Sequence, residues 1–384
     1  MSALGGLAIA SALLAMATSD LVVLVIALES MSLTAYGLVA LGGTDRAREA
    51  AMKYFVQGAV ASGMLLVALA VLFVGTGGTG GYAHVFAIDA GLSAVQPAGA
   101  LPSQALLLAW TLLAVAVAFK AGAFPFHSWA PDAYETALPA AAGLLASVSK
   151  VAAVAVMATL LGTRVLLAAP ADAGQAALAI AMLAAGSITF GNLVALRQRS
   201  LRRMLAYSGI AQVGYALIGI VTGAPWTTFL LVAVYAPAAL GAFLVAEALE
   251  SGDGDWDGSI EGLSGLSRTS PALAAALVVL MLSLTGVPLL AGFIGKLLVF
   301  ASAAKGPWLW LAILGAVGSV VSFGYYGAVI RSAYMAPDDD ASAPERRRTD
   351  VATVAACALA VVVVVAGVAP LLSGVALALR FFAG

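Results

Sequence analysis

The sequence has few charged residues and almost none of the groups that hold metals or disulfides. Only 10% of its 384 residues are Asp, Glu, Lys or Arg, against about 25% in a soluble domain, and the net charge is −1. This balance excludes a basic nucleic-acid-binding surface. The single cysteine, Cys357, excludes an internal disulfide, and the two histidines, His84 and His127, stand in no metal-ligand motif.

What the sequence has in excess is apolar residues, 62% of the total, which predicts an all-α polytopic membrane protein. A bilayer core takes roughly 20 apolar residues per helix. The first apolar run lacks the basic flank of a signal peptide and is interpreted as a span. Eleven spans are predicted: Leu4–Thr18, Leu21–Leu41, Ala51–Val74, Ala105–Phe124, Leu138–Leu161, Ala176–Leu196, Leu205–Val221, Thr227–Leu249, Ala272–Ala304, Trp308–Tyr334 and Val351–Leu379.

The distribution of Lys and Arg predicts the orientation. With a cytoplasmic N-terminus, eleven of the 18 basic residues fall on inner loops and three on the outer side, as the positive-inside rule expects. Eleven crossings then place the C-terminus outside. The remaining basic residues are Lys53, at the mouth of the third span, and three lysines within spans, Lys120, Lys150 and Lys296.

Two of the predicted spans contain helix-breaking residues. The fourth meets Gly122 and Pro125 close to Lys120, and the ninth contains Thr-Gly-Val-Pro, ending at Pro288, ahead of Lys296. Such breaks survive in a membrane where they are buried in protein or line a wet cavity. The two broken spans lie five helices apart and therefore cross in opposite directions, a pattern typical of inverted repeats. The predicted organisation within one membrane domain is a first repeat over 1–163, a second over 172–334, and a C-terminal helix over 351–379.

Three lysines and one acid within spans predict a proton path. A charge at the bilayer centre costs roughly 2.5–3.5 kcal/mol on insertion scales, so such residues face a bundle interior or a water-filled route. Burial favours the neutral amine, whereas a nearby carboxylate favours the ammonium. We expect Glu29, near the middle of the second span, to lie close to Lys120 and to switch its proton affinity. Two alternatives stay open: Lys120 snorkels to an interface, and Lys150 forms a purely structural pair with a glutamate.

Other polar features have simpler interpretations. Asp253, Asp255 and Asp257 begin a run that matches the first half of a calcium loop, but its twelfth position is Ser264 instead of glutamate. We interpret this run as a solvated cytoplasmic loop, with calcium binding as the alternative. Trp129 is interpreted, together with Tyr134, as an interfacial aromatic.

Six stretches resemble the antiporter-like subunits of respiratory complex I, over about Asp20 to Ala301. The run Phe119–Glu135, with a lysine thirty residues after Lys120, is most similar to the N type of that family. Lys296 after Gly-Phe-Ile-Gly differs from the M type, which carries glutamate there. The similar stretches are ALESMSLTAYGLVA, AMKYFVQGAVASG, AFKAGAFPFHSWAPDAYE, ASVSKVAAVAVM, RRMLAYSGIAQVGY and LSLTGVPLLAGFIGKLLVF.

The resemblance implies two inverted five-helix repeats, each with one broken helix, and a relay of Glu29, Lys120, Lys150 and Lys296. The family often has a histidine at the position of Gln212, which cannot titrate, so protons passing there would need water or a neighbouring hydroxyl. Bacterial members usually have three more helices before the point where this chain starts. The secondary relay or gating residues implied are His127, Tyr207, Ser208, Gln212, Pro125 and Pro288.

The expected function is proton translocation across the bacterial cytoplasmic membrane, as a translocase subunit of an NADH:quinone oxidoreductase. The resemblance implies no cofactor in this chain, with FMN, iron–sulfur clusters and quinone held by partner subunits. The expected partners are neighbouring antiporter-like and peripheral subunits and the lipid bilayer. Three alternatives stay open: a subunit of a multi-subunit Na⁺/H⁺ antiporter, a subunit of a membrane-bound hydrogenase-type complex, and a non-transporting membrane scaffold.

Overall fold

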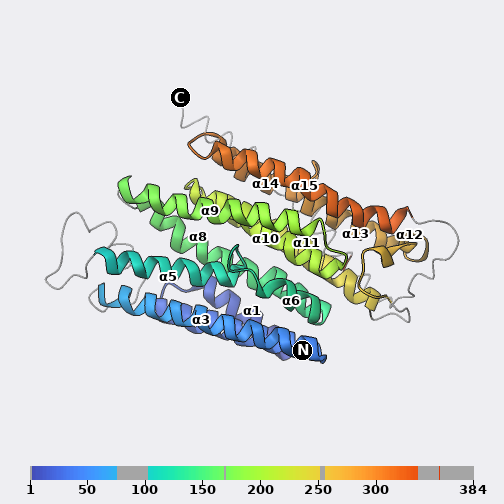
Figure 1. The fold of residues 1–384 in the computed structure, drawn as a ribbon, viewed down its shortest axis with the longest axis horizontal. Helices are drawn as coiled ribbons and strands as arrows, with labels where there is room; N and C mark the ends of the chain where they lie inside the picture. Colours follow the sequence, from blue (N-terminus) through green and yellow to red (C-terminus); the bar gives the residue numbers. More distant parts are fainter. Residues whose placement is uncertain (1, 76–102, 168–169, 251–255, 336–353, 355–384) are drawn as a thin grey trace.

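The described part of the chain is a bundle of helices, shown in Figure 1. A computed structural model describes residues 2–75, 103–167, 170–250, 256–335 and 354. Ser200 and Ser259 form an isolated antiparallel bridge. The elements are α1 (Ser2–Ala17), α2 (Leu21–Ala40), α3 (Asp45–Gly75), α5 (Ser103–Ala121), α6 (Trp129–Thr136), α7 (Pro139–Leu144), the π-helical turn η1 (Leu145–Ser149), α8 (Lys150–Leu167), α9 (Pro170–Ala195), α10 (Leu201–Val221), α11 (Pro225–Glu250), the 3₁₀ turn η2 (Glu261–Leu263), α12 (Leu266–Thr269), α13 (Pro271–Thr285), α14 (Ala291–Ala304) and α15 (Leu309–Tyr334).

The first ten predicted spans all coincide with described helices. Among the described residues, seven helical stretches are long and apolar enough to cross a bilayer, and four further apolar helices are shorter. Apolar side chains also cover the outside of the bundle, for example Val320, which is 75% exposed. An apolar exterior is what a lipid environment requires, so the multi-pass membrane prediction is confirmed. Predictions at His84, Cys357, Asp253 and Asp255, and the span 351–379 apart from residue 354, lie outside the described residues.

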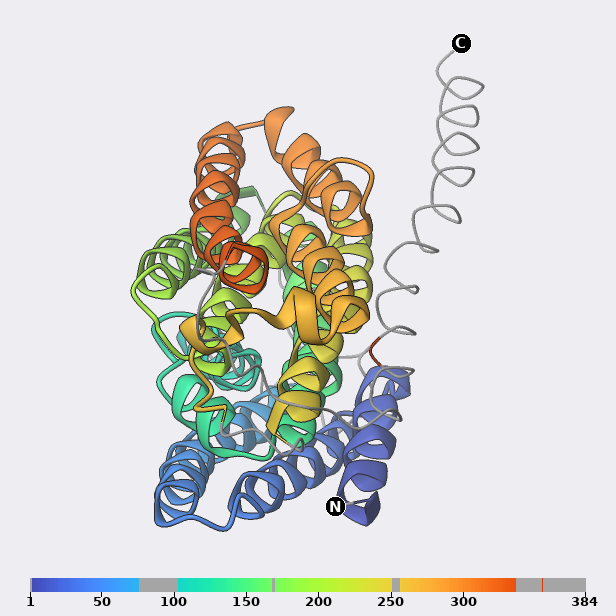
Figure 2. The same cartoon turned by 90° about the vertical axis from the view of Figure 1, so that its right-hand side faces the viewer.

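Helix α10 lies at the centre of the bundle. In Figure 2, which looks along the helices, α1 to α3 lie at one end and α13 to α15 at the other. In the most apolar stretch of α10, 94% of the residues are buried. Small residues allow this close packing. A Cβ added at Gly214, for example, would lie 2.8 Å from the backbone of Ala184 and Ile188 on α9.

The first predicted break is confirmed between α5 and α6. Helix α5 ends at Ala121, and Gly122 follows with φ +72°, a conformation that glycine adopts without a steric penalty. The Phe124–Pro125 peptide bond is cis. The indole N–H of Trp129 donates to the carbonyl oxygen of Phe119 at 2.9 Å, which satisfies an end carbonyl of α5.

The second predicted break is confirmed between α13 and α14. Helix α13 ends at Thr285, and Gly286 takes φ +87°. Pro288 and Leu289 lie on the exposed connection, where Leu289 also has a positive φ of +81°. Helix α14 then begins at Ala291. Lys296 therefore follows its break, whereas Lys120 precedes its own.

The fifth predicted span is not one regular helix. It consists of α7, the π-helical turn η1, and α8, which begins at Lys150 itself. Within the turn, the hydroxyl of Ser147 donates to the carbonyl oxygen of Gly143 at 2.6 Å. A π-turn adds a residue to the helical repeat and changes the direction of the side chains that follow, and such turns occur frequently at functional sites. The apolar pattern of this span does not indicate the π-turn.

Candidate functional site

Lys120 forms a buried ion pair with Glu29. Its Nζ lies 3.0 Å from Oε1 of Glu29 and donates to the hydroxyl of Ser32 at 2.7 Å. The same carboxylate oxygen accepts a hydrogen bond from Ser62 at 2.7 Å. The lysine side chain is 3% exposed and that of the glutamate 30%. The structure therefore brings together the two residues expected to meet, and the snorkelling alternative for Lys120 is wrong.

Lys150 lies in the centre of the bundle without a carboxylate. Among the described residues, no hydrogen-bond acceptor contacts its Nζ and no acid lies within ion-pair distance. The ammonium faces the ring of Tyr134, 5.5 Å from the ring centroid. A cation over an aromatic face gains about 0.5–2 kcal/mol, less than a buried charge loses on leaving water. The alternative of a structural Lys–Glu pair at Lys150 is not supported by these contacts.

Lys296 is held by the broken end of a helix. Its Nζ donates to the carbonyl oxygens of Leu284 at 3.0 Å and Thr285 at 2.9 Å, in the last turn of α13. The ring of Tyr215 lies 4.6 Å away on another side. The C-terminal end of a helix carries partial negative charge, and its last carbonyls lack partners within the helix. The break thus supplies oxygen ligands to the lysine without a carboxylate.

Two small cavities that share lining residues lie beside Lys150 and Lys296. One is lined by Lys150, the other by Lys296, and both are lined by Gln212, Tyr235 and Leu231. Each has about 10 Å³ of room for the centre of a water molecule, about the least that a cavity needs to hold one water.

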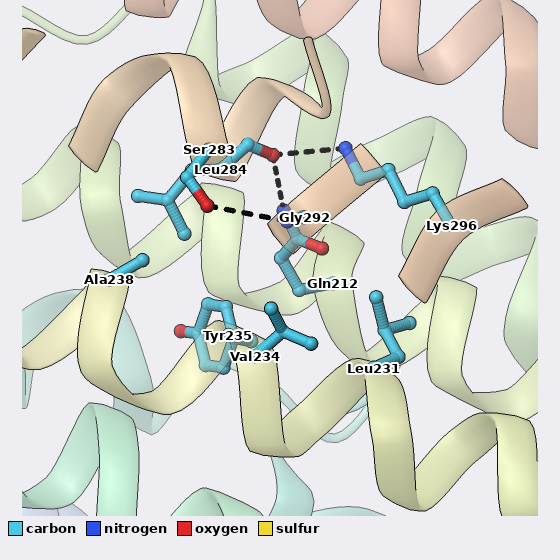
Figure 3. Close-up of a pocket in the computed structure, with 9 residues that line it drawn as sticks. All are labelled: Gln212, Leu231, Val234, Tyr235, Ala238, Ser283, Leu284, Gly292 and Lys296. Atoms are coloured by element: carbon cyan, nitrogen blue, oxygen red, sulfur yellow. Dashed lines mark hydrogen bonds between the residues drawn. The ribbon is translucent and has the colours of Figure 1, made fainter. Parts of the chain in front are cut away.

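Gln212, which lines both cavities, is hydrogen-bonded to the second broken helix. Its amide donates to the carbonyl oxygen of Leu284 at 2.9 Å, the same oxygen that Lys296 contacts. Figure 3 shows both side chains converging on that carbonyl. The residue that stands where the family often has a histidine therefore sits directly between two of the lysines.

Other predicted residues lie apart from these contacts. His127 packs in an aromatic cluster with Phe124 and Phe190, and Phe190 also contacts the ring of Tyr207. The hydroxyl of Ser208 donates to the backbone of its own helix at Leu205. None of these predicted residues lines either cavity. Pro125 and Pro288 lie on the two helix breaks.

The interfacial interpretation of two aromatics is wrong. Trp129 is 4% exposed and stacks on Tyr54 with ring centroids 4.0 Å apart. Tyr134 is fully buried and faces Lys150. Both follow the first break closely, so the chain folds them into the bundle instead of leaving them at its surface.

Sequence reasoning missed several polar partners. Ser32 was identifiable, because it stands three residues after Glu29 and so shares its helix face. Asn192 was not: its amide donates to the hydroxyl of Tyr215 at 3.0 Å and its carbonyl oxygen accepts from Tyr325 at 3.0 Å. This network joins α9, α10 and α15, and no local pattern in the sequence indicates such distant pairing.

Two arginines of α10 form ion pairs and a hydrogen bond with α6 and the residue that follows it. Nη1 of Arg203 lies 3.1 Å from Oδ1 of Asp132 and 2.7 Å from Oε2 of Glu135. Arg202 donates to the carbonyl oxygen of Ala137 at 2.8 Å. The acids of the Pro-Asp-Ala-Tyr-Glu motif thus fix the segment after the first break, and they make no contact with Lys120.

The described residues contain no cluster of three or more His, Cys, Asp or Glu side chains that would hold a metal ion. At the candidate calcium loop, the carboxylate of Asp257 accepts from the backbone N–H of Ser259 at 2.9 Å. Hydrogen bonds from the hydroxyl and the N–H of Ser259 hold the pKa of Asp257 below its usual range. This carboxylate therefore closes a local turn.

A sequence model described as "NADH:quinone oxidoreductase/Mrp antiporter, TM" matches residues 18–322. The chain belongs to this family. It is 40% identical over 347 residues to the NADH-quinone oxidoreductase subunit N 2 of Acidobacterium capsulatum, covering 87% of this chain and 67% of that protein. It is 38% identical over 348 residues to the subunit N of Methylobacterium nodulans, with 89% and 67% covered. The chain thus spans about two thirds of the length of these relatives.

Solved structures of the family share the fold. A chain of respiratory complex I from Thermus thermophilus matches with a TM-score of 0.76 and 32% identity, over 92% of this chain and 75% of that one. A chain of the archaeal membrane-bound sulfane sulfur reductase matches with a TM-score of 0.81 and 26% identity, over 94% and 71%. A chain of the Mrp complex from Dietzia sp. has a TM-score of 0.79 at 20% identity, over 95% and 74%, a likeness of fold alone.

Proposed function

We propose that this chain is a proton-translocating membrane subunit of an NADH:quinone oxidoreductase of the complex I type. The observation that carries the proposal is a set of three buried lysines in three different environments: one paired with a carboxylate, one unpaired, and one held by carbonyl oxygens. Such charges are costly to keep in a membrane, so a purely structural role leaves them without a compensating benefit. The curated relatives named subunit N, at up to 40% identity, support the same assignment.

The unpaired lysine is the centre of the mechanism. Because no acid in the described part of the chain neutralises Lys150, its ammonium is stabilised only weakly, and a nearby change in charge shifts its proton occupancy. Separation of Glu29 from Lys120 would change the field at Lys150. Lys150 would take its proton from the cytoplasmic side, and Lys296 would pass it outward.

The driving energy would come from outside this chain. FMN, iron–sulfur clusters and quinone belong to partner subunits in this proposal, and neighbouring membrane subunits transmit the conformational or electrostatic signal. The expected location is the bacterial cytoplasmic membrane, with the N-terminus of this chain on the cytoplasmic side, as the positive-inside distribution of basic residues supports.

Proton pumping in inverted membrane vesicles tests the proposal through Lys150→Met, which retains side-chain length and removes the titratable amine. NADH oxidation is recorded in parallel, and assembly is checked by native gel electrophoresis. Pumping should fall about tenfold or more in an assembled complex, the scale of losing one positioned proton carrier. Lys305→Ala, which alters an exposed lysine at the end of α14, is the control and should pump normally.

Normal pumping by assembled Lys150→Met would overturn the relay and leave the scaffold interpretation. Repeating the assay with and without Na⁺ tests the antiporter alternative. Pumping that requires Na⁺ would favour the antiporter interpretation of the family over the proton-only route.

A further inference from the structure

The two cavities between Lys150 and Lys296 have a second polar side chain in common besides Gln212. Tyr235, on α11, lines both of them, and its side chain is buried. In Figure 3 its ring lies next to Val234, and Gln212 lies between the ring and the carbonyl oxygen of Leu284. Unlike the amide of Gln212, a phenol hydroxyl can give one proton while it accepts another.

The hydroxyl of Tyr235 lies close to the ammonium of Lys150 because Gly209 has no side chain. A Cβ added at Gly209 would lie 2.5 Å from Nζ of Lys150 and 3.0 Å from the hydroxyl oxygen of Tyr235. The two polar atoms thus both border the space that a Cβ at Gly209 would fill. They form no direct hydrogen bond, and one water molecule in the adjoining cavity is enough to bridge them.

The nitrogen of Lys296 is arranged to receive a proton from the other cavity. Two of its N–H bonds are used by the carbonyl oxygens of Leu284 and Thr285. A neutral amine has two N–H bonds and one lone pair, so both donors are satisfied and the lone pair remains. Lys296 lines the second cavity together with Ser283 and Tyr235.

We infer that Tyr235 carries protons between Lys150 and Lys296, through one water molecule in each cavity, while Gln212 orders those waters. The inference rests on the proposed function. The Lys150 ammonium gives a proton to the first water, and that water passes one to the hydroxyl oxygen of Tyr235. The hydroxyl releases its own proton to the second water, which protonates the Lys296 amine. Each O–H or N–H bond that breaks is matched by one that forms, and Tyr235 ends as a neutral phenol.

Tyr235→Phe tests this step, because it removes the hydroxyl and keeps the ring. The matched control is Tyr54→Phe: Tyr54 is buried to the same extent as Tyr235, but it stacks on Trp129 and lines neither cavity. The measurements are protons pumped per NADH oxidised in inverted vesicles, and the ratio of pumping rates in H₂O and D₂O. Tyr235→Phe should lower pumping about tenfold and raise the isotope ratio, whereas Tyr54→Phe should leave both within about twofold of wild type.

A merely structural role of Tyr235 would lower the amount of assembled complex without changing the isotope ratio. An assembled Tyr235→Phe complex that pumps with the wild-type ratio and isotope effect overturns the inference. Lys150→Met in the same series separates the two claims. If Lys150→Met stops pumping and Tyr235→Phe does not, only this inference fails; if Lys150→Met pumps normally, the proposed function itself fails.

Gly209→Ala tests the geometry independently, since its Cβ would occupy the space where the two polar atoms meet. It should lower pumping several-fold in an assembled complex. Gly63→Ala is the control, because a Cβ at Gly63 meets nothing within 4 Å. Wild-type pumping by Gly209→Ala would contradict the placement of Tyr235 beside Lys150.

Discussion

The two broken helices each present a buried lysine, but they stabilise its charge in different ways. Lys120 ends the first helix of its pair, and its ammonium contacts the carboxylate of Glu29 on another helix. Lys296 follows its break, and its ammonium contacts carbonyl oxygens of Leu284 and Thr285 on the preceding half-helix. One lysine therefore depends on a side chain of opposite charge from another helix, and the other on fixed backbone dipoles.

Because of this difference, we expect Lys120 to act as a switch and Lys296 as a fixed proton acceptor. A carboxylate on a separate helix can move away, and its departure alters the stability of the Lys120 ammonium by several kcal/mol. The carbonyls at the end of α13 belong to the backbone and keep their dipoles in every protonation state. We therefore expect the first half to respond to partner subunits and the second half to offer a constant affinity for the proton.

The largest predicted effect is that of Glu29→Gln. The substitution leaves the Lys120 ammonium buried without a counter-charge, which costs on the order of 3–5 kcal/mol. Lys120 should then lose its proton, and pumping should fall at least tenfold in inverted vesicles while the complex still assembles. Glu49→Gln, at an exposed pair with Lys53, is the control and should pump normally. Full pumping by Glu29→Gln would show that the ion pair is no switch.

Arginine substitutions sharpen the comparison at both lysines. Arginine keeps the charge but does not release its proton, so Lys120→Arg and Lys296→Arg should both lower pumping about tenfold. Assembly should differ. At position 120 the planar guanidinium can pair with Glu29, whereas at position 296 it must fit between Gly286, Gln212 and a cavity of about 10 Å³. Native gels should show near-normal assembly for Lys120→Arg and clearly less for Lys296→Arg; equal assembly would contradict this account of the second site.

The sequence predicted one of these two environments and not the other. Glycine and proline predicted the positions of both breaks, because these residues interrupt regular helix. Because charged residues are scarce within the spans, Glu29 was the expected partner of Lys120. The partners of Lys296 are backbone carbonyls, which every residue has, so no residue type marks them. The predicted inverted repeats, 1–163 and 172–334, remain a prediction from pattern.

The surroundings of Lys150 could not be predicted from the sequence, for a related reason. The π-turn before Lys150 and the space at Gly209 depend on how helices pack. Gln212 was recognised only as a residue that does not titrate, whereas its contact with Leu284 shows how it orients the link. Packing of distant segments, not local pattern, determines both features.

A smaller effect is predicted for alanine substitutions at the two glycines that follow the first halves of the broken helices. Gly122 and Gly286 both have positive φ, so alanine at either costs about 1–2 kcal/mol of backbone strain. At Gly122 the nearest atom to an added Cβ is 3.7 Å away, whereas at Gly286 it is 3.0 Å from Cδ of Lys296. Thermal unfolding should therefore show similar losses for both alanine variants. Pumping should fall only for Gly286→Ala, and equal pumping by the two would contradict a precise cradle at Lys296.

The smallest predicted effect is that of Ser62→Ala. The Ser62 hydroxyl donates to the same carboxylate oxygen of Glu29 that Lys120 contacts. Its removal costs about 1 kcal/mol, because one hydrogen bond is lost while the ion pair and the Ser32 contact remain. Pumping should fall about twofold or less, measured beside Ser302→Ala, a hydroxyl on α14 that contacts none of the lysines. A loss as large as that of Glu29→Gln would mean that Ser62 itself takes part in moving the proton, and the first site would then resemble the hydroxyl-bearing link between Lys150 and Lys296 instead of a simple ionic switch.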